Sequence, residues 1–286
     1  MIELRGAGGE PVNFARTLLS HGVADLPPNR IAEDGSRLET VLPAEGGARV
    51  VVVEARGERV SVSPETPEID QQVRRMFALD QDLSGFYAVA AADPALAWAT
   101  AGAGRMLRSP TVFEDVVKTI CTTNCAWSGT VRMVTALVDH LGAPAVGAPD
   151  HHAFPTPAAM AAADEDFYRD VARAGYRGPY LRTLALDVAE GRVDLEALRG
   201  PALSDDEVAE SLLALAGVGP YAAAHMMMLL GRYRRLILDS WTRPKYRRVS
   251  GRARITDKGI ERAFRRYREF AGLAFWLTLT EDWIPS

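Results

Sequence analysis

Residues 204–241 read SDDEVAESLLALAGVGPYAAAHMMMLLGRYRRLILDSW, and this stretch decides the fold. The Ser-x-x-Glu pattern at 204–207 is a capping box, which predicts the start of a helix that ends at Gly217. Pro220 suits the first turn of a second helix, which the apolar residues 221–230 continue. The sequence therefore predicts two helices joined by a tight Gly-x-Gly turn.

The turn of this predicted hairpin, which spans residues 204–230, contains Gly217 and Gly219. Glycine lets the backbone amides at the start of the second helix point outward, where the helix dipole adds to their attraction for a DNA phosphate. A Gly-x-Gly turn alone is a weak signal, because any tight helical hairpin can use one. Whether this turn indicates DNA binding depends on the residues that follow it.

The segment 236–241 places Asp239 directly after three aliphatic residues. Apolar neighbours bury such a segment, so the carboxylate must be paired, cap a helix or act in catalysis. A hairpin followed by this aspartate resembles the helix-hairpin-helix (HhH-GPD) DNA glycosylase superfamily. The resemblance implies that Asp239 is the catalytic carboxylate. A purely structural role, capping the next helix through Ser240, is the alternative.

Other segments resemble the bacterial 3-methyladenine and 8-oxoguanine DNA glycosylase branch of this superfamily. Residues 21–29 resemble the start of its N-terminal sheet domain, 120–124 resemble the helix that opens its helical barrel, and 174–177 resemble the segment that meets the opposite DNA strand. By this resemblance, three residues fill the space left by an extruded base and touch its orphaned partner, namely Asn124, Tyr176 and Arg177.

The pattern along the chain predicts an α+β fold. The β-branched runs at 49–54 and 58–62 predict an antiparallel hairpin, and the later alanine- and leucine-rich segments predict helices. We expect an N-terminal antiparallel sheet domain with helices over residues 1–104 and a mostly α-helical HhH-GPD core over residues 105–286. Residues 141–157 are expected to form a loop.

The charge of the chain is unevenly distributed. Its net charge of -4 argues weakly against a nucleic-acid partner. Residues 231–270, however, contain 14 basic and 4 acidic side chains, a net charge of +10, which leaves -14 for the rest of the chain. This asymmetry is typical of a protein that meets a polyanion on one side. We predict that Arg243 and Arg247 of this stretch contact DNA phosphates.

An aromatic pocket for a base is expected beside Asp239. Tyr221 and His225 lie four residues apart and share one helix face, and Trp241 and Trp276 are further candidates for its wall. Aromatic faces attract cations, which favours an alkylated purine of the 3-methyladenine type as substrate. The 8-oxoguanine-like segments point to an oxidised purine instead, so the lesion stays open.

The resemblance implies an enzyme that flips a damaged base out of duplex DNA and hydrolyses its N-glycosidic bond. Some members use a lysine for a Schiff base and then nick the strand; the corresponding position here is Tyr221, which predicts a monofunctional enzyme. Lys245 remains an open alternative amine. Two other functions stay open, namely an 8-oxoguanine glycosylase, with or without lyase activity, and a non-catalytic helix-hairpin-helix DNA-binding protein.

We predict no metal and no other cofactor. The His151-His152 pair lacks a third ligand at a useful spacing, and Cys121 and Cys125 are too few for the four-cysteine iron-sulfur cluster of one branch of the superfamily. The first 20 residues contain no apolar stretch long enough for a signal sequence or a membrane span. The expected partner is double-stranded DNA with a damaged base, bound by a cytoplasmic monomer without membrane contact.

Overall fold

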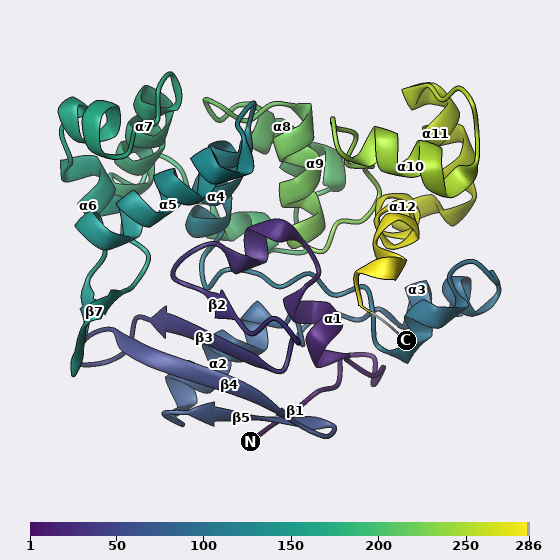
Figure 1. The fold of residues 1–286 in the computed structure, drawn as a ribbon, viewed down its shortest axis with the longest axis horizontal. Coiled ribbons are helices and arrows are strands. Elements are labelled where there is room, and N and C mark those ends of the chain that lie inside the picture. Colours follow the sequence, from purple (N-terminus) through teal and green to yellow (C-terminus); the bar gives the residue numbers. More distant parts are fainter. Residues whose placement is uncertain (285–286) are drawn as a thin grey trace.

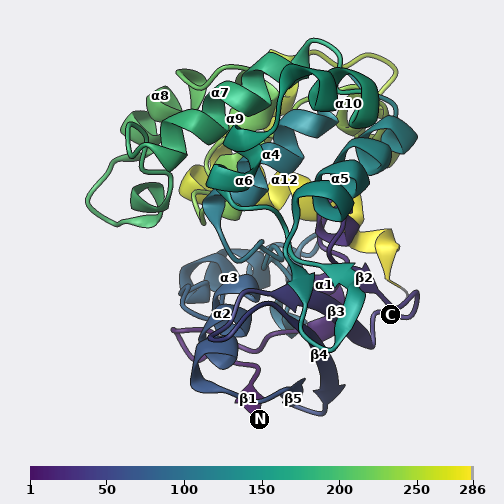
Figure 2. The same cartoon turned by 90° about the vertical axis from the view of Figure 1, so that its left-hand side faces the viewer.

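The structure, a computed structural model, describes residues 1–284 and has a sheet layer beneath a layer of helices (Figures 1 and 2). The sheet is antiparallel and has the strand order β1-β5-β4-β3-β2. Its strands are β1 (Ile2–Glu3), β2 (Arg30–Ile31), β3 (Arg37–Leu42), β4 (Arg49–Arg56) and β5 (Arg59–Ser63).

Strands β4 and β5 form the predicted hairpin, in which Val53 pairs with Val62. Alternate residues of β4, Val51 and Val53, are buried, and they join one apolar cluster with α1 (Phe14–Leu18) and α2 (Pro67–Met76). Because a shift by one residue would turn these valines to the opposite face, their burial sets the strand register.

The helical layer contains most of the remaining chain, so the predicted α+β fold is confirmed. No helix within residues 1–284 is both long and apolar enough to cross a membrane. The helices that follow α2 in the chain are α3 (Ser84–Ala91), α4 (Val112–Thr122), α5 (Trp127–Leu141), α6 (Pro157–Ala162), α7 (Arg177–Ala189), α8 (Asp205–Leu213), α9 (Pro220–Leu229), α10 (Thr242–Ser250), α11 (Asp257–Phe264) and α12 (Ala271–Thr280).

Helices α8 and α9 form the predicted hairpin next to the central helix α4 (Figure 1). Ser204 and Glu207 make both hydrogen bonds of the capping box that starts α8. Gly217 adopts a left-handed φ of +86°, which glycine tolerates and other residues rarely adopt, and it turns the chain toward Pro220 at the start of α9. Gly219 and Pro220, at the start of α9, are exposed.

Residues 141–157 differ from the predicted loop, because they contain the two-stranded ribbon β6 (Pro144–Ala145) and β7 (Ala148–His152). The amide of Val146 donates to the carbonyl of Ala48, which links the ribbon to the main sheet. The segment lacks the β-branched alternation that predicts a strand, so tertiary contact with the sheet decides its conformation.

Candidate active site

A cleft of about 1080 Å³ opens beside the turn of the α8–α9 hairpin. Its walls come from the end of α4, the start of α5, the first turns of α9, the segment before α10 and the C-terminal part of the chain. Ten of the predicted site residues line it, namely Asn124, Tyr176, Gly217, Gly219, Tyr221, His225, Asp239, Trp241, Arg243 and Trp276.

Asp239 lies half-buried at the wall of this cleft, just before α10. Its Oδ1 accepts hydrogen bonds from the amides of Trp241, at 2.8 Å, and Thr242, at 2.6 Å, and its own amide donates to the Thr242 hydroxyl. The carboxylate therefore caps the start of α10, as the structural alternative expects, but through Trp241 and Thr242 and not through Ser240. Both bonds use Oδ1, and no residue within 1–284 donates to Oδ2. The cap thus orients the carboxylate and leaves one oxygen available to a ligand.

Tyr221 and His225 lie one turn apart on α9, with parallel rings whose centroids are 6.4 Å apart. Burial, together with the nearby negative charge of Asp239, raises the pKa of Tyr221, although a hydrogen bond with Thr122 opposes this shift. The phenol therefore stays neutral at physiological pH. The two rings form one uncharged aromatic side of the cleft.

His21 meets His225 at the cleft, edge to face, with ring centroids 5.2 Å apart. Burial lowers the pKa of His21 to about 4, and the positive charge of Lys118 acts in the same direction. Burial, reinforced by His21, lowers the pKa of His225 to about 3. Both imidazoles are therefore neutral at pH 7, and this part of the cleft carries no positive charge.

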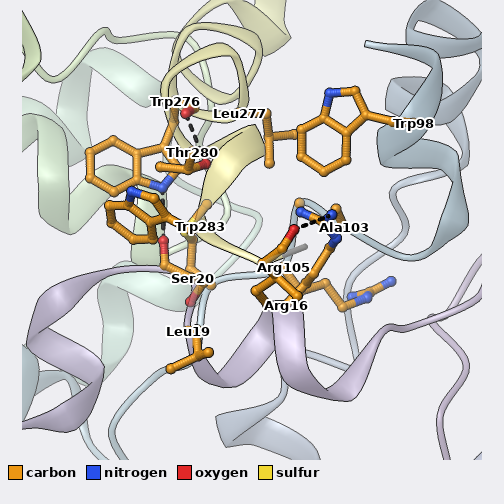
Figure 3. A pocket seen from close by; sticks show the side chains of 13 residues that line it. Arg16, Leu19, Ser20, Trp98, Ala103, Arg105, Trp276, Leu277, Thr280 and Trp283 are labelled. Atoms are coloured by element: carbon orange, nitrogen blue, oxygen red, sulfur yellow. Dashed lines mark hydrogen bonds between the residues drawn. The ribbon is translucent and has the colours of Figure 1, made fainter. Parts of the chain in front are cut away.

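Three tryptophans form a second aromatic side, since Trp241, Trp276 and Trp283 have mutual centroid distances of 5.6 to 5.9 Å. The indole N–H of Trp276 donates to the carbonyl of Ser20 at 2.8 Å, which fixes its ring against the N-terminal layer (Figure 3). Trp276 is nearly buried, whereas Trp241 and Trp283 expose about a third of their surface. This side of the cleft thus has one fixed and two accessible indole rings.

The sequence-based prediction missed three aromatic residues of the cleft, namely His21, Trp127 and Trp283. Trp127 lies at the start of α5 and is 49% exposed, which is unusual for so large an apolar side chain. Each of the three comes from a segment distant in sequence from the hairpin. No periodicity or spacing signal connects them to Asp239, so only the folded chain brings them together.

Comparisons with solved structures show that the chain shares its fold with DNA glycosylases. An 8-oxoguanine glycosylase/lyase from Clostridium acetobutylicum, in complex with double-stranded DNA containing cytosine opposite 8-oxoguanine, matches with a TM-score of 0.75 and 21% identity, over 94% of this chain and 91% of its own. A 3-methyladenine DNA glycosylase from Archaeoglobus fulgidus matches with a TM-score of 0.74 and 21% identity, over 99% and 98%. The chain has the helix-hairpin-helix glycosylase fold.

A DNA-3-methyladenine glycosidase from Bacillus halodurans shares part of this glycosylase fold. It matches with a TM-score of 0.52 and 21% identity, over 70% of this chain and 89% of its own. No protein-family model matches the sequence, and no curated protein matches it either. The similarity to these proteins is therefore one of fold, and the function has to be inferred from the side chains that line the cleft.

One loop of the glycosylase fold, between α4 and α5, contains Asn124 in a left-handed conformation with a φ of +45°. Its amide Nδ2 lies 3.4 Å from the Tyr176 hydroxyl, so these two predicted wedge residues meet at the mouth of the cleft. Arg177 differs from the expectation, because it is buried and does not line the cleft. Its guanidinium donates to the carbonyls of Thr123 and Asn124 instead. Arg177 therefore holds the loop in place from behind.

Arg243 and Arg247, the two residues predicted to contact DNA phosphates, lie in different surroundings. Arg243 lines the cleft, but its Nε and Nη2 donate to the two carboxylate oxygens of Asp257, at 2.7 and 2.9 Å. Arg247 is exposed on α10 and lies outside the cleft lining. The positive charge of Arg243 is thus largely compensated, whereas that of Arg247 faces solvent.

The chain contains only three lysines, and none of them lines the cleft. Lys245 lies 2.6 Å from the carboxylate of Asp282, and buried Lys118 lies 2.7 Å from that of Glu114. Lys258 lies on α11. Within residues 1–284 no cluster of three His, Cys, Asp or Glu side chains is placed to hold a metal ion.

The two buried histidines predict a pH dependence of stability. The unfolded chain protonates them near the ordinary histidine pKa of about 6.5, but the folded protein does so only near 4 and 3. We therefore expect the free energy of unfolding to fall as the pH falls below about 6.5, by up to about 1.4 kcal/mol per pH unit for each histidine.

Denaturant unfolding at pH 7.5, 6 and 5 measures this effect. His225→Asn is a suitable comparison, because its amide can keep the hydrogen bond that His225 Nδ1 makes with Thr119 at 3.3 Å. The variant should lose less stability than the parent between pH 7.5 and 5. If the free energy of unfolding fell equally with pH in the two proteins, His225 would not be held neutral by burial.

Proposed function

We propose that the protein is a DNA glycosylase of base-excision repair that removes an alkylated purine from duplex DNA. The observation that carries this proposal is the position of Asp239, whose Oδ1 is tied to α10 while Oδ2 is left without a protein donor within residues 1–284, at the wall of an aromatic cleft. A carboxylate held in this way suits chemistry on a base that has been turned out of the helix.

The hairpin supplies the DNA-binding part of the proposed mechanism. Amides at the start of α9, next to Gly219, bind a backbone phosphate with the help of the helix dipole. Asn124 and Tyr176 at the cleft mouth fill the space left in the duplex. Both steps present the extruded nucleotide to Asp239, because all of these residues border one cleft.

Asp239 then acts on the bond between base and sugar. As this bond lengthens, the sugar gains oxocarbenium character, and a fixed carboxylate stabilises the developing positive charge and orients the attacking water. The purine leaves with the bonding electrons, and water supplies the new hydroxyl group on the sugar. A protein that only binds phosphates requires neither this carboxylate nor an aromatic cleft, which argues against the non-catalytic alternative.

The charge of the cleft supports an alkylated, cationic purine as substrate. Tyr221, His21 and His225 are neutral, Arg243 is paired with Asp257, and the Asp239 carboxylate attracts a cation. The indole faces add a cation–π attraction of about 0.5–2 kcal/mol for each well-placed ring. The similarity to a 3-methyladenine DNA glycosylase over 99% of this chain agrees with the same choice.

The scarcity of lysine supports a monofunctional reaction. A lyase step needs an unprotonated amine that attacks the sugar carbon, yet Tyr221 occupies the expected hairpin position and Lys245 is paired with Asp282 outside the cleft lining. The second candidate function is excision of 8-oxoguanine, because a glycosylase/lyase for that base matches this chain with a TM-score of 0.75. That candidate and the alkylpurine proposal make different predictions for the same assay.

A panel of duplexes, each with one defined lesion, tests the proposal. We expect release of 3-methyladenine or 7-methylguanine, with strand breaks only after alkali, and no covalent adduct after borohydride treatment. The 8-oxoguanine glycosylase/lyase serves as a positive control for trapping. Robust excision of 8-oxoguanine opposite cytosine with no release of alkylated bases would favour the second candidate. A trapped adduct that disappears in Lys245→Gln would contradict the monofunctional reaction.

A further inference from the structure

His21 has no role in the proposed function so far, yet its side chain lines the cleft from the segment that follows α1. Only 5% of its surface is exposed. Its Nε2 lies 2.7 Å from the carbonyl oxygen of Leu107. Since a carbonyl oxygen can only accept a hydrogen bond, Nε2 must carry the ring proton of the neutral imidazole.

The other ring nitrogen, Nδ1, is consequently an acceptor with a free lone pair. It is buried and has no hydrogen-bond partner among residues 1–284. The neighbouring aromatic ring, His225, directs its own Nδ1 toward Thr119. A buried acceptor without a partner is unfavourable, because water has been removed from it and no donor replaces it. A ligand that brings an N–H group to this nitrogen would restore the missing bond.

We propose that His21 is a specificity-determining residue, whose Nδ1 accepts a hydrogen bond from an exocyclic amino group of the extruded base. The inference rests on the proposed function and defines the substrate class more narrowly, as alkylated purines that carry an amino group. This group is the 6-amino group of a 3-alkyladenine or the 2-amino group of a 7-alkylguanine. A purine without it presents either an acceptor or no polar group to the same lone pair.

The charge of the lesion favours the same contact. Alkylation of a purine ring nitrogen in DNA gives the base a positive charge, which makes its amino N–H a stronger donor. A neutral imidazole accepts from such a donor, whereas a protonated one would repel it. Because burial keeps His21 neutral, the same residue discriminates by hydrogen bonding without opposing the cation.

Binding of free methylated bases tests this inference without requiring bond cleavage. Four tryptophans line the cleft, so quenching of tryptophan fluorescence reports on occupancy. Two pairs of bases differ in the amino group: 3-methyladenine against 3-methylhypoxanthine, which has a 6-oxo group and a ring N–H instead, and 7-methylguanine against 7-methylhypoxanthine, which has only a hydrogen at C2. We expect the protein to prefer the amino member of at least one pair by about tenfold, the typical effect of one buried hydrogen bond. The pair that shows the preference identifies the amino group that is recognised.

Two substitutions of His21 distinguish the roles of its two ring nitrogens. His21→Gln places an amide near the Nε2 position, where it can keep the bond to Leu107 but provides no acceptor at Nδ1, so the preference should disappear. His21→Asn places an amide oxygen near the Nδ1 position and should keep at least part of the preference for the base with the amino group. Thermal melts monitored by circular dichroism establish that each variant is folded.

Two results would overturn the inference. Equal affinity for both members of both pairs would do so, as would a preference that persists in folded His21→Gln. These outcomes differ from failure of the proposed function, which is the absence of any alkylated-base release in the lesion panel. A protein that excises methylated purines but binds the paired bases equally would remain a glycosylase without the assigned role for His21.

Discussion

Asp239→Asn is expected to reduce base release in a single turnover by at least about 10³-fold, because the carboxylate acts on charge that develops in the transition state. The amide oxygen of asparagine can still accept from Trp241 and Thr242, so the cap of α10 and the fold should persist. Affinity for lesion-containing duplex should stay within about tenfold, since the phosphate contacts come from the hairpin.

The measurement is quenched single-turnover excision with enzyme in excess, alongside a binding titration on the same duplex. Asp164→Asn is the matched control, because it makes the same chemical change at a carboxylate that also accepts a hydrogen bond from a backbone amide, that of Phe167 at 2.8 Å, and that lies outside the lining of the base cleft. That variant should retain excision close to the parent rate. Activity of Asp239→Asn near the parent level would refute the catalytic assignment.

Gly272→Ala should give the second large effect, although the residue lies in α12 and does not line the cleft. The amide of Gly272 donates to the carbonyl of Tyr233 at 2.7 Å, and a Cβ at Gly272 would lie only 2.1 Å from the carbonyl oxygen of Arg235. The backbone that leads to Asp239 must therefore shift. We expect a loss of about 1–3 kcal/mol in the free energy of unfolding and about 10²-fold in excision rate.

Gly85→Ala is the matched control for this substitution. Gly85 is also the second residue of its helix, α3, but an added Cβ would lie 3.4 Å from a side-chain atom of Phe270, at the limit of ordinary contact. Its stability and excision rate should stay close to those of the parent. If Gly272→Ala behaves like Gly85→Ala, the segment from 233 to 239 is not positioned by α12.

The local features of the fold follow from residue order alone. The capping box at Ser204, the helix-starting Pro220 and the valines of β4 each act on neighbours within a few residues, and the structure contains the predicted hairpin and strands. Asp239 also stands out in the sequence, because an acid after three aliphatic residues needs an explanation. Local propensity and periodicity are encoded at short range, so they are readable without the tertiary structure.

The surroundings of each side chain depend on segments that are distant in sequence. Only the folded chain brings His21 against His225, buries Arg177 behind the loop at Asn124, and pairs Arg243 with Asp257. The sequence determined that this chain forms a helical hairpin followed by an acid at the end of an aliphatic run, with an antiparallel sheet before them. The tertiary structure decided which side chains remain free to meet a ligand, because burial and pairing are set by contacts that no local pattern specifies.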